Sequence, residues 1–276
     1  MARPLRIEFP GAFYHVTTRG NAQAHIFRND EERELFLELL AKVVERFAFL
    51  CHAYCLMGNH YHLLVETQRG NLSDGLRHLN GVYTQAVNRR QGTSGHLFAG
   101  RYKAILVEKE AHLLSLSRYI VLNPVRASLC ASAADWRWSS YRASVGEAPA
   151  PSFLCVDELL ASFGERRGQA QESYRAYVND GREEDPFDRL RSQIYLGSEE
   201  FIARHADDNE RLSEVPREQW QPLRPALADI LASEGERGIL AANRRYGYRL
   251  REIADHLGCH VSTVSRKVSR LGGENA

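Results

Sequence analysis

The sequence has little of what marks secreted and membrane proteins. Its five cysteines in 276 residues are few and odd in number, which fits reduced thiols better than a disulfide framework. No run approaches the roughly 18 consecutive apolar residues typical of a transmembrane helix. The first residues, MARPLRIEFPGAF, lack the apolar core and small-residue cleavage site of a secretory signal. We therefore expect a cytoplasmic protein with no membrane partner.

Net charge is also nearly absent, at +1, but it is distributed unevenly along the chain. Residues 1–145 carry 18 Lys/Arg against 12 Asp/Glu, a net +6. Residues 146–220 carry 9 against 17, a net −8, and residues 221–276 carry 9 against 6, a net +3. Two basic parts around an acidic one suit two separate contacts with a polyanion, although such excesses also occur on ordinary solvated surfaces.

Hydrophobic periodicity in the first 145 residues alternates between strand and helix patterns. Strands are expected over residues 11–20, 47–57, 59–66 and 101–108, and helices over residues 29–47, 71–90 and 110–122. Gly58-Asn59 marks a hairpin turn, and Asn29 and Glu32 have the spacing of a capping box. The order β-α-β-β-α-β followed by a helix predicts an α+β fold, a ferredoxin-like split βαβ sandwich with one added helix.

The rest of the chain is expected to be helical. Residues 146–220 show short helical patterns and acidic clusters, which we interpret as an acidic helical connector. Residues 221–276 end in two short helical segments broken at Gly258, a helix-turn-helix pattern, although an ordinary helical hairpin would look similar. Leu250, Ile253, Ala254 and Leu257 should form the apolar side of the first segment. If the second segment reads DNA, its major-groove residues are Ser262, Thr263, Ser265 and Arg266.

The stretch LMGNHYHLLVE places two histidines in an otherwise apolar strand. Side chains alternate along a strand, so His60 and His62 face one side, roughly 6–7 Å apart, while Tyr61 faces the other. Two imidazoles at that spacing can hold one metal ion, but they can also be half-buried histidines bonded to neighbours. These residues alone leave both alternatives open.

The third expected helix carries a candidate reacting group. Tyr119 and Asn123 lie one turn apart, so a phenol and an amide can reach the same spot. Pro124 disfavours helical geometry at Asn123, so we expect the helix to end there. Beside a hard divalent cation, a tyrosine can form a covalent phosphodiester bond to DNA. Alternatively, Tyr119 packs at the edge of the core.

The pattern C-x₃-C-x₄-H-x-H, which begins at Cys51 and Cys55, suggests a competing zinc site. In a strand the two sulfurs would lie about 13 Å apart, too far to share one ion at zinc–sulfur distances near 2.3 Å. A zinc site would need this segment to be helical, so we do not favour it.

At this point the motifs resemble a known family. MGNHYHLLVE matches the HUH motif, and RYIVLNPVRASL matches the tyrosine motif of single-tyrosine HUH transposases. The flanking blocks FYHVTTRGN, HIFRNDEERELF, GHLFAGRYKAILVE and DWRWSSYRAS are similar to those of the REP-associated tyrosine transposases (RAYTs). The resemblance covers about residues 5–145, and some members also carry a C-terminal helix-turn-helix.

The resemblance implies a fold, a reaction and a set of site residues. Residues 1–145 would be the HUH catalytic domain, with Tyr119 as nucleophile and with Mg²⁺ or Mn²⁺ bound by His60, His62 and Asn123. The enzyme would cut single-stranded or hairpin DNA at repeat or insertion elements, form a 5′-phosphotyrosine, and pass that end to a free 3′-OH. Insertion-sequence relatives carry glutamine at the position of Asn123. The alternative is a non-catalytic DNA-binding regulator derived from a transposase.

DNA contacts are expected from both basic parts of the chain. In the catalytic part we expect them from Arg19, Asn21, Arg101, Lys103 and Arg126. Arg101 and Lys103 lie two apart in an expected strand, so both should face one side, where they grip phosphates or form a solvated edge. Residues 221–276 would bind duplex DNA. We expect a monomer or a homodimer.

Overall fold

The computed structural model describes residues 7–181, 185–189, 194–206, 227–235, 237–244, 248 and 250–273. These residues form two compact units, one within residues 6–190 together with Tyr195–Gly197 and one mainly from Ser198 onward. No described helix is long and apolar enough to cross a membrane.

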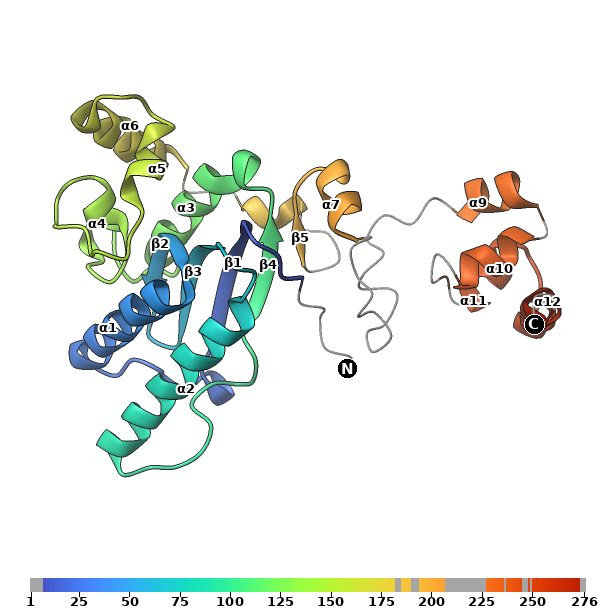
Figure 1. Cartoon of the computed structure of the whole chain (residues 1–276), viewed down its shortest axis with the longest axis horizontal. Helices are drawn as coiled ribbons and strands as arrows, with labels where there is room; N and C mark the ends of the chain where they lie inside the picture. Colours follow the sequence, from blue (N-terminus) through green and yellow to red (C-terminus); the bar gives the residue numbers. More distant parts are fainter. Residues whose placement is uncertain are drawn as a thin grey trace. The chain divides into compact units, whose positions relative to one another are not determined.

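The larger unit is built on a five-stranded sheet (Figure 1). Its strands are β1 (Ala12–Arg19), β2 (Phe49–Leu56), β3 (His60–Thr67), β4 (Lys103–Val107) and β5 (Tyr195–Leu196). They are ordered β2-β3-β1-β4-β5, and β1 pairs antiparallel with both β3 and β4. The first four strands have the order of a split βαβ sandwich, so the predicted α+β fold is confirmed. The short β5 extends this sheet parallel to β4.

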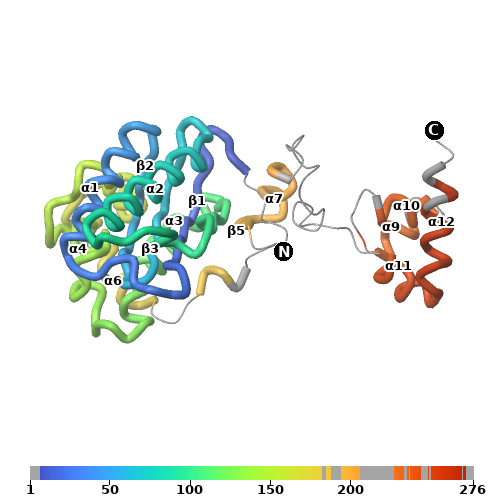
Figure 2. The backbone as a smooth tube through the Cα atoms, turned by 90° about the horizontal axis from the view of Figure 1, so that it is seen from below, coloured from blue at the N-terminus to red at the C-terminus, as the bar shows by residue number. Residues whose placement is uncertain are grey.

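The three long helices cover the two faces of the sheet (Figures 1 and 2). They are α1 (Asp30–Phe47), α2 (Leu72–Gln91) and α3 (Lys109–Arg126). On one face, the fully buried ring of Tyr61 packs against Phe36 of α1, with ring centroids 4.8 Å apart. On the other face, His62 meets Tyr119 of α3, with centroids 6.1 Å apart. The predicted alternation along β3 is therefore confirmed.

The start of α1 keeps half of the expected capping box. The Oδ1 of Asn29 accepts a hydrogen bond from the backbone N–H of Glu32 at 3.0 Å. The carboxylate of Glu32 reaches one residue further back than expected and accepts from the N–H of Arg28 at 2.8 Å. It also accepts from Gln91 at the end of α2, which ties the two helices together.

The prediction that Arg101 lies in a strand is wrong. The β1–β4 ladder begins at Lys103, which pairs with Thr17. Earlier in the chain, Phe98 forms a separate bridge with Gly20, just after β1. The N–H of Ala99 donates to the carbonyl of Arg19 at 2.9 Å, so the chain bulges between these contacts. Gly100 permits the bulge, because its φ of 140° is hard for other residues to adopt. Arg101 lies in this bend.

After α3 the chain covers the edge of the sheet at β2. Cys51 bridges to Leu154 and Cys55 bridges to Ser139, so later residues occupy the free side of this strand. The elements of this segment are η2 (Ala133–Asp135), α4 (Tyr141–Ser144), α5 (Val156–Ala161) and α6 (Arg167–Asp180), and η3 (Pro186–Arg189) follows and packs against α3. Tyr174 of α6 is fully buried and anchors this segment.

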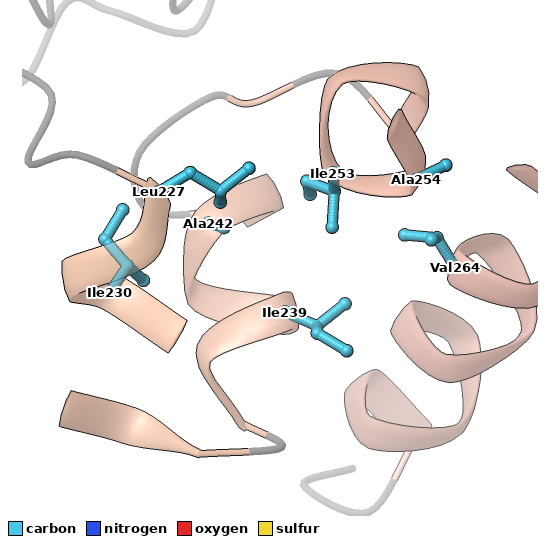
Figure 3. Packing of buried hydrophobic residues seen from close by; sticks show 7 residues of the cluster. All are labelled: Leu227, Ile230, Ile239, Ala242, Ile253, Ala254 and Val264. Carbon is cyan, nitrogen blue, oxygen red and sulfur yellow. The ribbon is translucent and has the colours of Figure 1, made fainter. Parts of the chain in front are cut away.

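The smaller unit is helical. Its helices are α7 (Glu199–Ala206), α9 (Leu227–Glu234), α10 (Arg237–Arg244), α11 (Leu250–His256) and α12 (Val261–Gly273). The last four enclose the buried cluster of Figure 3: Leu227, Ile230, Ile239, Ala242, Ile253, Ala254 and Val264. Gly258 turns the chain between α11 and α12 with a φ of 62°. Contrary to expectation, Leu257 is 40% exposed, because α11 ends one residue before it.

Candidate functional site

The two histidines of β3 lie together beneath α3. The ring centroids of His60 and His62 are 5.0 Å apart. His60 is half-buried, whereas His62 is buried. The Nε2 atom of His62 has no hydrogen-bond partner among the described residues. A buried ring nitrogen without a partner is costly, so this atom is a natural position for a ligand.

A third histidine, which the sequence analysis missed, completes this group. The Nε2 of His15 lies 2.9 Å from the Nδ1 of His62, and the two rings stack with centroids 5.2 Å apart. The contact follows from the topology, since β1 lies beside β3 and pairs with it over His15 and Leu64. The sequence does show His15, in the motif FYHVTTRG. Its role could be predicted only from the strand order, which places β1 next to β3.

Asn59, in the turn before β3, holds the first histidine. Its Oδ1 lies 2.7 Å from the Nδ1 of His60. Its Nδ2 donates to the backbone carbonyl of Gln23 at 3.2 Å. Asn59 therefore links the histidine to the one-turn helix η1 (Asn21–Gln23), which follows β1.

The prediction that α3 ends at Asn123 is wrong, because the helix continues through Pro124 to Arg126. Pro124 has no N–H to donate to the carbonyl one turn earlier, at Ile120. The Nδ2 of Asn123 lies 3.5 Å from this carbonyl oxygen and 2.9 Å from that of Tyr119. The side-chain amide thus donates mainly to Tyr119 and lies at the limit of hydrogen-bond distance from the Ile120 carbonyl that proline leaves without a donor. Because its nitrogen faces these carbonyls, its oxygen faces the other way.

The site residues surround a cavity of about 500 Å³. Its lining residues are Met57, His60, Tyr119, Asn123, Arg126, Ala127 and Asp185. The guanidinium of Arg126 lies over the Tyr119 ring, 4.6 Å from its centroid. Phe187 of η3 packs against Tyr119 edge to face, with centroids 5.0 Å apart. Asp185 and Phe187 were not expected here, because they lie more than 60 residues after the tyrosine in a segment without a motif.

Burial keeps all three imidazoles neutral near pH 7. It lowers the pKa of His15 to about 3 and that of His60 to about 4, and the positive charges of Lys103 and Arg19 respectively lower these pKa values as well. It also holds the pKa of His62 well below its ordinary value. A neutral imidazole keeps one nitrogen lone pair, which is the form that binds metal ions.

The phenol of Tyr119 is also neutral. Burial raises its pKa above the ordinary value, and the carboxylate of Asp185 raises it further. The Arg126 guanidinium has the opposite effect on this pKa. A tyrosine must lose its proton to react as a nucleophile. The positive charge of Arg126 lies where it favours the phenolate form of Tyr119.

The expected DNA-binding residues of the larger unit fall into two groups. Arg126 lines the cavity, and Arg19 pairs with His60 across the β1–β3 ladder. Lys103 lies exposed on β4 opposite Thr17, on the α3 side of the sheet. Asn21 and Arg101 do not line the cavity, since they lie in η1 and in the bend before β4.

The expected major-groove residues lie on α12. Ser262 and Arg266 are exposed, and Thr263 and Ser265 are partly exposed. The Oγ of Ser262 lies 2.8 Å from the Nδ1 of His260, and Arg266 donates to the carbonyl of Ser262 at 3.3 Å. The first turns of α12 thus present hydroxyl and guanidinium groups to solvent.

Among the described residues, one group of three His, Cys, Asp or Glu side chains has metal-ligand spacing: His52, Glu66 and Glu158. No cysteine belongs to it. The Nζ of Lys109 already contacts Glu66, at 2.5 Å, and also contacts Glu158. A charged ammonium therefore occupies the position that a cation would take, and we interpret this group as an ion-pair network.

Comparison with known proteins gives matches that include β3 and most of α3. Residues 9–123 match a protein-family model described as "Transposase IS200 like". A search of curated proteins finds no match. Among solved structures, the chain is similar to a REP-associated tyrosine transposase bound to a REP hairpin, with 18% identity and a TM-score of 0.48 over 60% of this chain and 98% of that one. It is also similar to a proposed transposase from Deinococcus radiodurans R1, with 17% identity and a TM-score of 0.32 over 43% and 95%.

Proposed function

We propose that this chain, which matches the IS200-like transposase model over residues 9–123, cuts and rejoins single-stranded DNA with Tyr119 as the nucleophile. The observation that carries this proposal is the cavity itself. One phenol, one half-buried imidazole and one guanidinium converge there from α3 and β3, which are far apart in the sequence. A phosphodiester in this cavity would meet a nucleophile and a positive charge together.

We further propose that His60, His62 and Asn123 hold Mg²⁺ or Mn²⁺. Three features support this ligand set: the partnerless Nε2 of His62, the neutral ring of His60, and the orientation of the Asn123 amide. Because the amide nitrogen is used by helix carbonyls, the side-chain oxygen, which hard cations prefer, is the atom left for the cavity. When bound, such an ion would polarise the scissile phosphate and stabilise the leaving oxygen.

The proposed reaction is a balanced exchange of esters. The Oη of Tyr119 attacks phosphorus, the bond to the 3′ oxygen breaks, and the strand's 5′ end becomes joined to the enzyme as a phosphotyrosine. The phenol proton leaves by way of solvent, and the released 3′ oxygen ends as a hydroxyl. A second 3′-OH then attacks the phosphotyrosine, which rejoins the DNA and regenerates the phenol. The guanidinium of Arg126 stabilises negative charge on the tyrosine oxygen in both steps.

The substrate we propose is single-stranded DNA from hairpin-forming repeat or insertion elements, as the sequence motifs imply. A single strand can reach a phenol that lies in a cavity between a helix and a sheet. The exposed basic side chains of Arg19 and Lys103, on the α3 side of the sheet, would contact its phosphates.

Covalent capture tests this function. Single-stranded hairpin DNA is incubated with full-length protein and Mn²⁺, and adducts are resolved by denaturing electrophoresis. The wild type should form an adduct that Tyr119→Phe cannot form, since this change removes one oxygen and little volume. Tyr102→Phe is the matched control, because Tyr102 is buried and its hydroxyl lies 3.0 Å from Ser73. An adduct that persists in Tyr119→Phe contradicts the proposed nucleophile, and a wild type without adduct favours the non-catalytic regulator.

We also propose that the smaller unit binds duplex DNA through α12. The exposed Arg266 and Ser262 on the first turns of this helix support the proposal. Arg266→Ala in the full-length protein should weaken binding to target-flanking duplex while leaving cleavage of a short single strand unchanged. Equal duplex affinity of variant and wild type, measured by fluorescence anisotropy, would exclude Arg266 as a contact.

A further inference from the structure

We propose that Asn59 and His15 are positioning residues: Asn59 fixes the tautomer of His60, and His15 supplies the acceptor that lets His62 carry its proton on Nδ1, so that each ring can present an unprotonated Nε2 to a divalent cation. The inference rests on the proposed function, because it concerns the cation that these histidines would hold. It adds two residues that are not among the proposed ligands of the cation. Each acts through the other nitrogen of one histidine ring, Nδ1.

For Asn59 the orientation follows from what its amide can donate. The carbonyl of Gln23 can only accept, so the group 3.2 Å from it must be the amide nitrogen of Asn59. The atom 2.7 Å from the Nδ1 of His60 is then the amide oxygen, which can only accept as well. The proton of neutral His60 must therefore lie on Nδ1. This leaves the lone pair on Nε2.

The backbone around Asn59 holds this amide in place. Its carbonyl accepts from the N–H of Gly20 at 2.8 Å, and the carbonyl of Gly58 accepts from the N–H groups of Ile26 and Phe27, each at 3.0 Å. Gln23 itself has a φ of 61°, a left-handed conformation that is unfavourable for a non-glycine residue. A strained acceptor held by several bonds next to a site is typical of a segment that orients other groups.

For His62 the partner is another ring, so the two protons must be assigned together. If the Nε2 of His15 donated, His62 would carry its own proton on Nε2 and could not bind a cation there. If the Nδ1 of His62 donates, its Nε2 is unprotonated, and the remaining proton lies on the Nδ1 of His15. The Nδ1 of His15 and the Nε2 of His62 are both buried without partners among the described residues. A cation bound to the Nε2 of His62 would therefore favour the arrangement in which the Nδ1 of His62 donates to His15.

Without these partners, each ring would favour the opposite tautomer, since free neutral imidazole side chains carry their proton mainly on Nε2 in water. Each lost partner would therefore force the ring to move its proton before it could bind the cation. Loss of a partner to a metal-binding histidine typically lowers metal affinity about 10–100-fold.

The first test measures the tautomers directly in metal-free protein labelled with ¹⁵N-histidine. Long-range ¹H–¹⁵N correlation spectra at pH 7.5 report which nitrogen of each ring carries the proton. In the wild type we expect His60 to be protonated on Nδ1. Asn59→Asp keeps an acceptor for this proton and should preserve the tautomer, whereas Asn59→Leu should shift it to Nε2. A wild-type His60 protonated on Nε2 overturns the inference, whether or not any variant folds.

The second test measures Mn²⁺ binding by calorimetry without DNA. Asn59→Leu and His15→Phe should each raise the dissociation constant about 10–100-fold. Asn59→Asp and His15→Gln, which restore an acceptor near the same position, should recover most of the affinity. Asn88→Leu is the matched control, since this asparagine also donates to a loop carbonyl, that of Gly95 at 3.0 Å, but does so at the end of α2.

The outcomes separate the two proposals. If wild-type protein binds no Mn²⁺, the proposed cation site fails, and the tautomer spectra still decide whether Asn59 orients His60. If the wild type binds Mn²⁺ and Asn59→Leu and His15→Phe bind it equally well, the positioning roles are excluded. Thermal melts of every variant show whether a loss of affinity is a loss of fold.

Discussion

The α3 side of the sheet carries two polar clusters with similar components and opposite properties. At one end, His62 of β3 lies beneath Tyr119, near the end of α3. At the other end, Glu66 of the same strand meets Lys109 at the start of the same helix. Each cluster has buried histidine and oxygen groups that a cation could use. One opens onto a cavity, and the other is closed by an ammonium from the chain itself.

This difference shows that metal-ligand residue types and spacing are not sufficient to identify a metal site. His52, Glu66 and Glu158 lie close enough together to hold a cation, yet a lysine of the same chain contacts both carboxylates. Charge decides between the two clusters. Lys109 already neutralises the carboxylates, whereas the Nε2 of His62 is buried without a partner.

The largest expected effect separates the two clusters by activity. His60→Ala and His62→Ala should each lower the rate of single-strand cleavage in Mn²⁺ by more than about 10–100-fold, the loss typical when a residue that only supports a metal ligand is changed. His52→Ala is the matched control and should retain the wild-type rate, since Lys109 replaces any cation there. Rates are measured on a fluorescent hairpin substrate. A His52→Ala variant as inactive as His60→Ala would move the proposed metal site to the other cluster.

The second prediction concerns acid stability, to which both clusters contribute in the metal-free protein. Burial lowers the folded-state pKa of His15 to about 3 and that of His52 to about 4. Below an ordinary pKa of about 6.5 the unfolded chain binds protons that these rings do not. Stability from both groups is therefore complete above pH 6.5 and is lost as the pH falls toward 4, at up to about 1.4 kcal/mol per pH unit for each group.

Urea unfolding of the larger unit from pH 7 to pH 4.5 measures this loss. His15→Phe and His52→Phe should each flatten the dependence of unfolding free energy on pH. A wild-type free energy that does not change between pH 6.5 and pH 4.5 would contradict the burial of these neutral rings.

The third prediction removes the cation that closes the second cluster. Lys109→Met leaves the carboxylates of Glu66 and Glu158 facing each other near His52, so the unfolding free energy should fall by about 1–3 kcal/mol. This expected loss of unfolding free energy is smaller than for a fully buried ion pair, because Glu158 is 43% exposed. Added Zn²⁺ should recover part of this loss in the variant and should not stabilise Arg77→Met, which breaks an exposed ion pair on α2. A Lys109→Met variant that Zn²⁺ does not stabilise would show that His52, Glu66 and Glu158 cannot form a metal site even without the lysine ammonium.

The smallest expected effect concerns the exposed charge beside the first cluster. Lys103→Ala should reduce the slope of log affinity against log salt for a single strand by about 0.7, the value for one phosphate contact. Lys42→Ala, on α1 and thus on the opposite side of the sheet, should leave the slope unchanged. Equal slopes for Lys103→Ala and the wild type would exclude this lysine as a phosphate contact.

Local patterns predicted the parts of the molecule that depend on nearby residues. The period of two in β3 placed His60 and His62 on one face, and the helical period placed Tyr119 and Asn123 on one stripe. His15 was missed because its contact with His62 spans 47 residues and exists only once β1 lies beside β3. The bend at Arg101 was missed because it depends on a second contact between the chain and β1, which no local pattern reports.

Under the proposed function the amide of Asn123 has two tasks at once, as a helix donor and as a metal ligand, and this limits how the protein can be redesigned. Its nitrogen donates to the carbonyl of Tyr119 and also lies within reach of the Ile120 carbonyl, which Pro124 leaves without its usual N–H donor. An engineer who exchanges this residue for glutamate or histidine to change metal preference would also remove the donor that bridges the proline. A clean exchange of ligand therefore requires Pro124→Ala in the same gene, which returns the backbone donor to the helix and frees position 123 to vary.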